Sequence, residues 1–168
     1  MVWGISRRLM YTPASGPMSR PCRPASSSPR AESALLPPRL TLMAKTVLVV
    51  DDNPVIRRSL CELFRQHADF VICGQAENGF EAIEKAQQHK PDLIVLDLAM
   101  PGMSGLEAAR VISGIMPEIP IILFTLYSDS LVLEQARSVG IATVISKGER
   151  PRLLIDKARS LLNKSEAA

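Results

Sequence analysis

Five short apolar runs, each followed by a polar residue, constrain the fold of this chain more than any other feature. Uninterrupted runs of Val, Ile and Leu are typical of strands buried on both faces, and such strands occur in parallel sheets with helical crossovers. Helical spacing of apolar residues alternates with these runs. We predict strands at Thr46–Val50, Phe70–Gly74, Asp92–Leu96, Pro120–Phe124 and Ile141–Ile145.

The helical segments between the runs each present one apolar stripe. In the first helix the stripe is spaced i, i+4, i+7, i+8 and consists of Ile56, Leu60, Leu63 and Phe64. Capping residues predict the starts of three helices at Asn53, at Asn78, and at Ser128 or Asp129. Glu107 is expected to be an ordinary solvent-facing charge. Alternating strands and helices with right-handed crossovers predict an α/β fold, a three-layer doubly wound sheet of five parallel strands.

Polar residues at the ends of four of these strands predict a single site. Asp51 and Asp52 follow the first strand, Asp97 the third, Thr125 the fourth and Lys147 the fifth. In doubly wound sheets the ligand crevice lies at the carboxyl ends of the strands. We therefore expect these five side chains to gather at one edge of the sheet.

Residues 1–43 differ in composition from the rest of the chain. Residues 1–42 contain seven of the 13 prolines, six arginines and one glutamate, whereas the remaining residues carry a small excess of acidic side chains. This composition predicts a disordered extension over residues 1–43 and one folded domain over residues 44–168. Met43 directly precedes the first strand, so a misplaced translation start is one explanation of the extension. A functional disordered arm and a targeting segment are the alternatives.

Charge and hydropathy exclude two classes of partner. The net charge of +3 comes from the extension, and the predicted domain has no basic stripe of the kind that binds nucleic acid. No apolar run approaches the ~20 residues of a membrane span. We therefore expect a cytoplasmic protein with no nucleic-acid or membrane partner. The cysteines lack metal-ligand spacing, and Cys61 and Cys73 are expected to pack as reduced thiols.

The residues at the strand ends resemble those of the receiver domain of bacterial two-component response regulators. The resemblance rests on Asp51, Asp52, Asp97, Thr125 and Lys147, and on the loop from Asp97 to Gly105. It covers about residues 45–163 and is chemotaxis-regulator-like. Within that group the chain is most similar to the receivers attached to helix-turn-helix regulators of the nitrate-response and quorum-response type. The resemblance implies a flavodoxin-like (βα)5 fold.

This resemblance implies a phosphoacceptor signalling protein of a two-component phosphorelay that uses Mg²⁺. Three carboxylates about 5 Å apart repel one another by roughly 3 kcal/mol per pair at an effective dielectric constant of 20. A cation is therefore required, and oxygen ligands suit Mg²⁺. Asp52 and Asp97 would bind the metal directly, Asp51 through water, and Ala99 through its backbone carbonyl. Asp97 would be the residue that accepts the phosphoryl group.

The same resemblance assigns roles to Lys147 and Thr125 and raises a question about the switch. Lys147 would neutralise charge on the transferred oxygens, and Thr125 would donate a hydrogen bond to the phosphoryl group. The family usually has an aromatic ring three residues before this lysine, where the chain has Val144. We therefore expect Tyr127 and the start of the following helix to move instead. Tyr127 is also expected to cover the phosphorylated aspartate and prolong its lifetime.

The expected partners are a sensor histidine kinase or a histidine phosphotransfer protein. The segment after the last predicted helix is short, so we expect a stand-alone receiver that acts through a downstream protein or by self-association. The output face would comprise the fourth helix, the fifth strand and the fifth helix. Two alternatives stay open. One is a metal-dependent aspartyl phosphatase, which would usually have a second aspartate where this chain has Ala99, and the other is a non-phosphorylated binding module.

Overall fold

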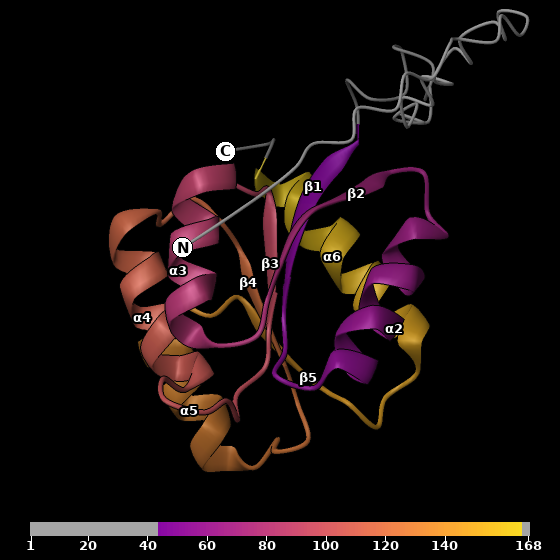
Figure 1. Cartoon of the computed structure of the whole chain (residues 1–168). Helices are drawn as coiled ribbons and strands as arrows, with labels where there is room; N and C mark the ends of the chain where they lie inside the picture. The colour runs from indigo at the N-terminus through magenta and orange to yellow at the C-terminus, as the bar shows by residue number, and fades with distance from the viewer. Residues whose placement is uncertain (1–43, 166–168) are drawn as a thin grey trace, which may run out of the picture. The chain divides into compact units, whose positions relative to one another are not determined.

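Five parallel strands form one sheet in the order β2-β1-β3-β4-β5 (Figure 1). A computed structural model describes residues 44–165, so the predicted extension, residues 1–43, lies outside the described residues. The strands are β1 (Lys45–Val50), β2 (Phe70–Ala76), β3 (Leu93–Leu96), β4 (Ile121–Thr125) and β5 (Thr143–Ser146). The helices are α2 (Pro54–Arg65), α3 (Gly79–His89), α4 (Gly105–Ile115), α5 (Ser130–Ser138) and α6 (Pro151–Ser165). The predicted doubly wound, flavodoxin-like fold is confirmed.

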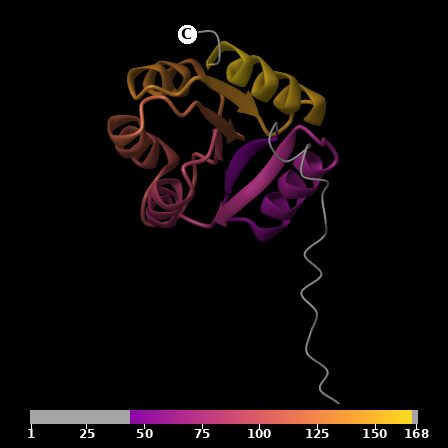
Figure 2. The same cartoon turned by 90° about the horizontal axis from the view of Figure 1, so that it is seen from above.

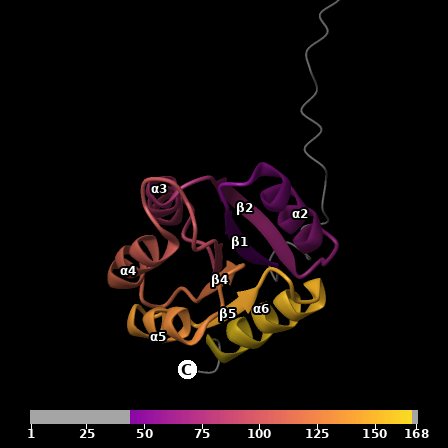
Figure 3. The same cartoon turned by 90° about the horizontal axis from the view of Figure 1, so that it is seen from below.

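The sheet is covered by helices on both faces. Helices α3, α4 and α5 lie on one face, and α2 and α6 lie on the other, as the views from either end of the strands show (Figures 2 and 3). Two apolar clusters fill the two interfaces. Successive residues of a strand point to opposite faces, so Leu48 and Val50 join the first cluster while Val47 and Val49 join the second. Strands buried on both faces explain the continuous apolar runs in the sequence.

Strand boundaries differ from the predicted ones by one or two residues at several ends. β2 continues two residues beyond Gly74 because it pairs with β1 as far as Ala76, with an irregularity in the register between Val47 and Leu48. Asp92 precedes β3 instead of belonging to it. Its carboxylate Oδ2 accepts hydrogen bonds from the backbone N–H and the hydroxyl of Thr46, both at 2.7 Å.

Side-chain caps begin the helices where the sequence indicates. Asn53 and Asn78 cap α2 and α3, and Asp129, the second of the two predicted candidates, caps α5 by accepting a hydrogen bond from the backbone N–H of Val132. Glu107 faces solvent as predicted, but it has a capping role that the prediction did not include. Its carboxylate accepts hydrogen bonds from the backbone N–H and hydroxyl of Ser104, which completes a capping box at the start of α4.

The two cysteines of the domain agree with the prediction of free thiols that pack as small apolar side chains. Cys61 and Cys73 are unpaired, and both pack against the apolar clusters. Among the described residues, no helix combines the length and the apolar character that crossing a bilayer requires.

Candidate functional site

The polar residues at the strand ends meet at the carboxyl edge of the sheet. Backbone hydrogen bonds extend the pairing past the last strand residues: Asp51 donates its N–H to the carbonyl of Ala76 at 3.1 Å, and Asp97 donates to the carbonyl of Val50 at 2.9 Å. At the other side of the site Lys147 donates its backbone N–H to the carbonyl of Thr125 at 2.8 Å. These contacts hold four predicted site residues at the ends of adjacent strands.

Three carboxylates converge at this edge. Asp51, Asp52 and Asp97 each offer an oxygen, and these oxygens lie within 4.8 Å of one another. Asp51 and Asp97 are buried, whereas Asp52 is exposed. The cluster therefore has a dry inner side and an open side toward solvent.

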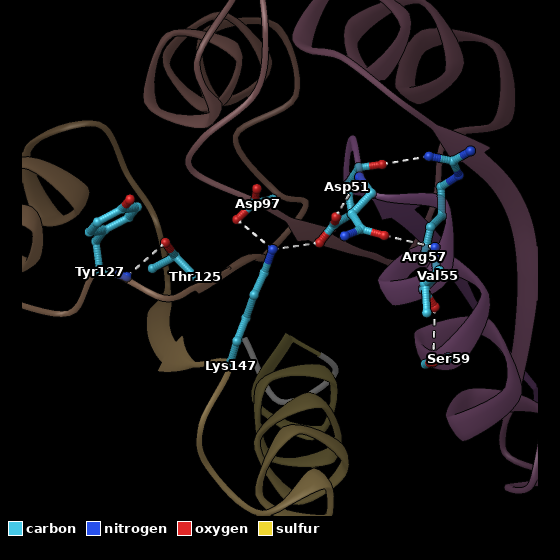
Figure 4. Close-up of polar contacts among 9 residues, drawn as sticks. Asp51, Val55, Arg57, Ser59, Asp97, Thr125, Tyr127 and Lys147 are labelled. Carbon is cyan, nitrogen blue, oxygen red and sulfur yellow. Dashed lines mark hydrogen bonds and ion pairs between the residues drawn. The ribbon is translucent and has the colours of Figure 1, made fainter.

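The ammonium group of Lys147 lies between the two buried carboxylates (Figure 4). Its Nζ is 2.8 Å from Oδ2 of Asp51 and 3.0 Å from Oδ1 of Asp97. The side chain reaches the site from the end of β5, and its aliphatic stem is largely shielded from water. One fixed cation thus offsets part of the negative charge of the cluster.

The buried polar side chains of the described domain are gathered at this site. Among the described residues, the buried polar or charged ones are Asp51, Asp97 and Thr125. Burying such groups costs free energy unless they are paired. These three residues lie at one edge of the sheet, and the rest of the described core has no buried polar side chain. This concentration of buried polar groups indicates a functional site.

The charges of the site shift the pKa values of two groups. Burial raises the pKa of Asp97 above its ordinary value, and Asp51 adds to this shift while Lys147 opposes it. Burial acts to lower the pKa of Lys147, but hydrogen bonds and charge from Asp51 and Asp97 outweigh it and raise that pKa. Lys147 is therefore a permanent cation at neutral pH. An additional cation near Asp97 would stabilise its carboxylate form.

The donor set fits Mg²⁺. It offers carboxylate oxygens alone, which are the ligands that this cation prefers. Oδ2 of Asp51 is buried and accepts no well-directed hydrogen bond from a described residue, although the Lys147 ammonium lies close to it. An acceptor in this state has free capacity for a further electropositive partner. Ala99 lies in the loop after β3, two residues beyond Asp97 in the chain.

Thr125 and Tyr127 form the second part of the site. The hydroxyl of Thr125 is buried and accepts a hydrogen bond from the backbone N–H of Tyr127 at 3.1 Å (Figure 4). The ring of Tyr127 is 59% exposed. The hydroxyl is therefore held by the loop between β4 and α5. A movement of Thr125 toward a new partner would alter its hydrogen bond with the N–H of Tyr127 in that loop.

Two residues at the start of α2 hold Asp51, and sequence reasoning assigned neither of them this role. Asn53 donates its backbone N–H to Oδ1 of Asp51 at 3.0 Å. Arg57 donates from Nη1 to the backbone carbonyl of Asp51 at 2.7 Å. No sequence signal separates Arg57 from the adjacent Arg58, because only the rotation of the helix decides which of them faces the loop.

An apolar groove of about 630 Å³ lies beside the site, along α2 and the start of α6. Lys147 is one of its lining residues. Its apolar lining includes Ile56, Leu63, Phe124 and Leu154. The carboxyl edge of the sheet thus adjoins a groove with room for another molecule.

Comparisons with known proteins agree with this geometry. The model of the response regulator receiver domain family matches residues 47–159. The transcriptional regulatory protein PdtaR of Mycobacterium tuberculosis is 36% identical over 103 residues, which are 61% of this chain and 49% of that protein. The transcriptional activator protein ExaE of Pseudomonas putida is 28% identical over 116 residues, 69% of this chain and 54% of that protein. The chain thus spans about half the length of these curated relatives.

A solved structure extends the agreement to the fold. The response regulator domain of CheB from Thermotoga maritima superposes with a TM-score of 0.68 at 29% sequence identity, covering 71% of this chain and 97% of that domain. The resemblance inferred from the strand-end residues is confirmed. Since the family match spans all five strands, the chain belongs to the response regulator receiver domains, which are phosphoacceptor signalling modules of two-component systems.

Proposed function

We propose that Asp97 is the phosphoacceptor of this receiver and that a phosphohistidine of another protein is the donor. The observation that carries the proposal is the burial of the Asp97 carboxylate beside Asp51, with the Lys147 ammonium 3.0 Å from its Oδ1. In the reaction a carboxylate oxygen of Asp97 attacks phosphorus while the bond from phosphorus to the imidazole nitrogen breaks. The product is an acyl phosphate on Asp97.

Mg²⁺ would be held by Asp52 and Asp97 directly, by Asp51 through water and by the backbone carbonyl of Ala99. When bound, it supplies positive charge that stabilises the transferred phosphoryl oxygens. The free capacity of Asp51 Oδ2 supports this assignment. The exposed side of the cluster at Asp52 leaves water able to reach the metal.

Lys147 and Thr125 would act on the transferred group from the other side. The ammonium of Lys147 already lies between the carboxylates and would form an ion pair with a phosphoryl oxygen. The hydroxyl of Thr125 would donate a hydrogen bond to another oxygen. A movement of Thr125 toward that oxygen would lengthen the hydrogen bond that its hydroxyl accepts from the backbone N–H of Tyr127, and this would release the loop before α5.

The phosphoacceptor is tested by incubating the full chain with acetyl phosphate and Mg²⁺. We expect incorporation that is labile to acid and to base, as an acyl phosphate is, into the wild-type protein and none into Asp97→Asn. The variant Asp129→Asn, whose acidic residue caps α5 outside the carboxylate cluster, is the control and should incorporate phosphate normally. Incorporation that persists in Asp97→Asn would refute the assignment. Steady release of phosphate from many monoesters would instead support the phosphatase alternative, for which no other finding speaks.

The donor would be a sensor histidine kinase or a histidine phosphotransfer protein. The groove along α2 and α6 supports this proposal because its lining is mostly apolar and includes Lys147, whose ammonium contacts the phosphoacceptor. A helix of the donor lying there would bring its histidine to the site. Such partners act in the cytoplasm, where we place this protein, and we assign it no nucleic-acid or membrane partner of its own.

Tyr127 would control how long the acyl phosphate survives. Its ring is exposed and stands two residues beyond Thr125, while Ala99, two residues beyond Asp97, has no group to orient a water molecule. We expect Tyr127→Ala to hydrolyse at least about threefold faster, a barrier change of roughly 0.7 kcal/mol. Loss of radiolabel from the phosphorylated protein measures this rate. Leu126→Ala, which removes the neighbouring exposed side chain, should leave it unchanged.

The output surface would be the exposed apolar patch formed by Leu126, Tyr127 and Leu131, at the start of α5. These side chains are 69%, 59% and 61% exposed. Leu133, which also lies on α5, is less exposed and is not part of the patch. Val144 packs against the first apolar cluster, the one that contains Leu48 and Val50, and it has no aromatic ring that could move. Release of the loop that holds Tyr127 would therefore rearrange the patch itself.

Self-association through this patch has a direct test. We expect beryllofluoride with Mg²⁺ to raise the sedimentation coefficient of the wild-type chain toward that of a dimer, and we expect Leu131→Asp to stay monomeric because it buries a charge at the contact. Glu134→Gln on the same helix is the control. If beryllofluoride leaves the wild-type mass unchanged, the output is docking to a different protein.

A further inference from the structure

Arg57 holds the loop that carries two of the three carboxylates. It lies in the first turn of α2, and its Nη1 donates to the backbone carbonyl of Asp51 at 2.7 Å (Figure 4). The contact is partly buried. Hydrogen bonds from a charged donor are shorter and stronger than those between neutral groups.

With this contact, the N–H, the carbonyl and Oδ1 of Asp51 are each hydrogen-bonded, and Oδ2 has an ion-pair partner. Its N–H donates to the carbonyl of Ala76, its Oδ1 accepts from the backbone N–H of Asn53, and its Oδ2 lies beside Lys147. The carbonyl oxygen held by Arg57 belongs to the peptide group that joins Asp51 to Asp52. Because a peptide group is planar, fixing its oxygen also fixes the direction of the bond to the α-carbon of Asp52.

Asp52 has no such support of its own. Its side chain is exposed and makes no hydrogen bond or ion pair with any described residue. The direction of its carboxylate therefore depends on the backbone before it. Arg57 is the side chain that holds that backbone from outside the strand.

We propose that Arg57 is a positioning residue that orients the Asp51–Asp52 peptide so that both carboxylates face one cation. The inference rests on the proposed Mg²⁺ site. Arg57 makes no hydrogen bond or ion pair with the carboxylate of Asp51, Asp52 or Asp97. It acts through the backbone carbonyl alone.

The charge of Arg57 and its hydrogen bond to Asp51 should have opposite effects on Mg²⁺ affinity. A guanidinium near the cluster repels a second cation, so removing only its charge should strengthen Mg²⁺ binding. Removing a positioning contact should weaken binding, and loss of such outer contacts typically costs about 10–100-fold in metal affinity. The sign of the change therefore separates the two roles.

The experiment titrates Mg²⁺ into the full chain by isothermal calorimetry. We expect Arg57→Gln to raise the dissociation constant about tenfold and Arg57→Lys, which keeps the charge and one donor, to lie between Arg57→Gln and wild type. Arg58→Gln removes the same charge from the next residue, which is exposed, and should change the constant by less than about twofold. An unchanged or smaller constant in Arg57→Gln would overturn the proposal.

A second measurement does not need the metal. Amide hydrogen exchange in Mg²⁺-free buffer should be faster at Asn53, whose N–H donates to Oδ1 of Asp51, in Arg57→Gln than in wild type, and unchanged in Arg58→Gln. Equal exchange in all three proteins would also overturn the positioning role. If the wild-type chain binds no Mg²⁺, the proposed metal site fails, and that result is distinct from tight binding retained by Arg57→Gln.

Discussion

Asp52→Ala is expected to abolish both Mg²⁺ binding and phosphorylation of Asp97 while leaving the fold at least as stable as in the wild type. Asp52 is a proposed direct metal ligand, so its loss removes a bond to the cation and one of three negative charges. Its exposed carboxylate makes no contact that the fold would lose. At a water-like dielectric constant the repulsion relieved is on the order of 1 kcal/mol or less. Calorimetry with Mg²⁺ and thermal unfolding in metal-free buffer measure the two effects.

Two neighbouring variants make this prediction specific. Glu77→Ala removes another exposed carboxylate that borders the same hollow as Asp52 but lies outside the three-carboxylate cluster, and it should weaken Mg²⁺ binding only slightly. Asp51→Ala should also lose the metal but should destabilise the fold by about 1–3 kcal/mol, because it leaves the N–H of Asn53 and part of the Lys147 charge unpaired. A clear fall in the melting temperature of Asp52→Ala without metal would contradict the account.

Gly105→Ala is expected to destabilise the domain by about 3 kcal/mol or more and to impair phosphorylation in whatever protein still folds. A Cβ atom at Gly105 would lie far inside van der Waals contact of the carbonyl oxygen of Asp97, 2.9 Å from its carbonyl carbon and 3.0 Å from the α-carbon of Leu98. All of these atoms belong to the backbone, so no side chain can turn aside. The start of α4 must therefore move away from the residue that would accept the phosphoryl group.

Gly114 on the same helix provides the matched control for this effect. A Cβ atom there meets nothing within 4 Å, and the residue is exposed. Gly114→Ala should stabilise the domain by up to about 1 kcal/mol, since alanine favours helix more than glycine does. Chemical denaturation of both variants gives the two free energies of unfolding. Equal effects at the two positions would show that close packing against Asp97 is not what requires Gly105.

Local patterns in the sequence were sufficient for the architecture. Buried parallel strands leave continuous apolar runs, and capping residues such as Asn53 and Asn78 act on backbone groups within three positions in the chain. Both signals are short-range, so they survive in the sequence itself. The capping box of Ser104 and Glu107 is equally local and was visible in the same way, as a serine followed three residues later by glutamate.

The sequence by itself also determined that Asp51, Asp97 and Lys147 lie together, because parallel strands bring their carboxyl ends to one edge of the sheet. Only the tertiary structure decided how adjacent residues of the same type differ. Asp51 is buried against Lys147 while Asp52 faces solvent, and Arg57 holds the loop while Arg58 does not. These differences depend on which way each side chain points once the helices are packed on the sheet, and that direction results from contacts between segments far apart in the chain.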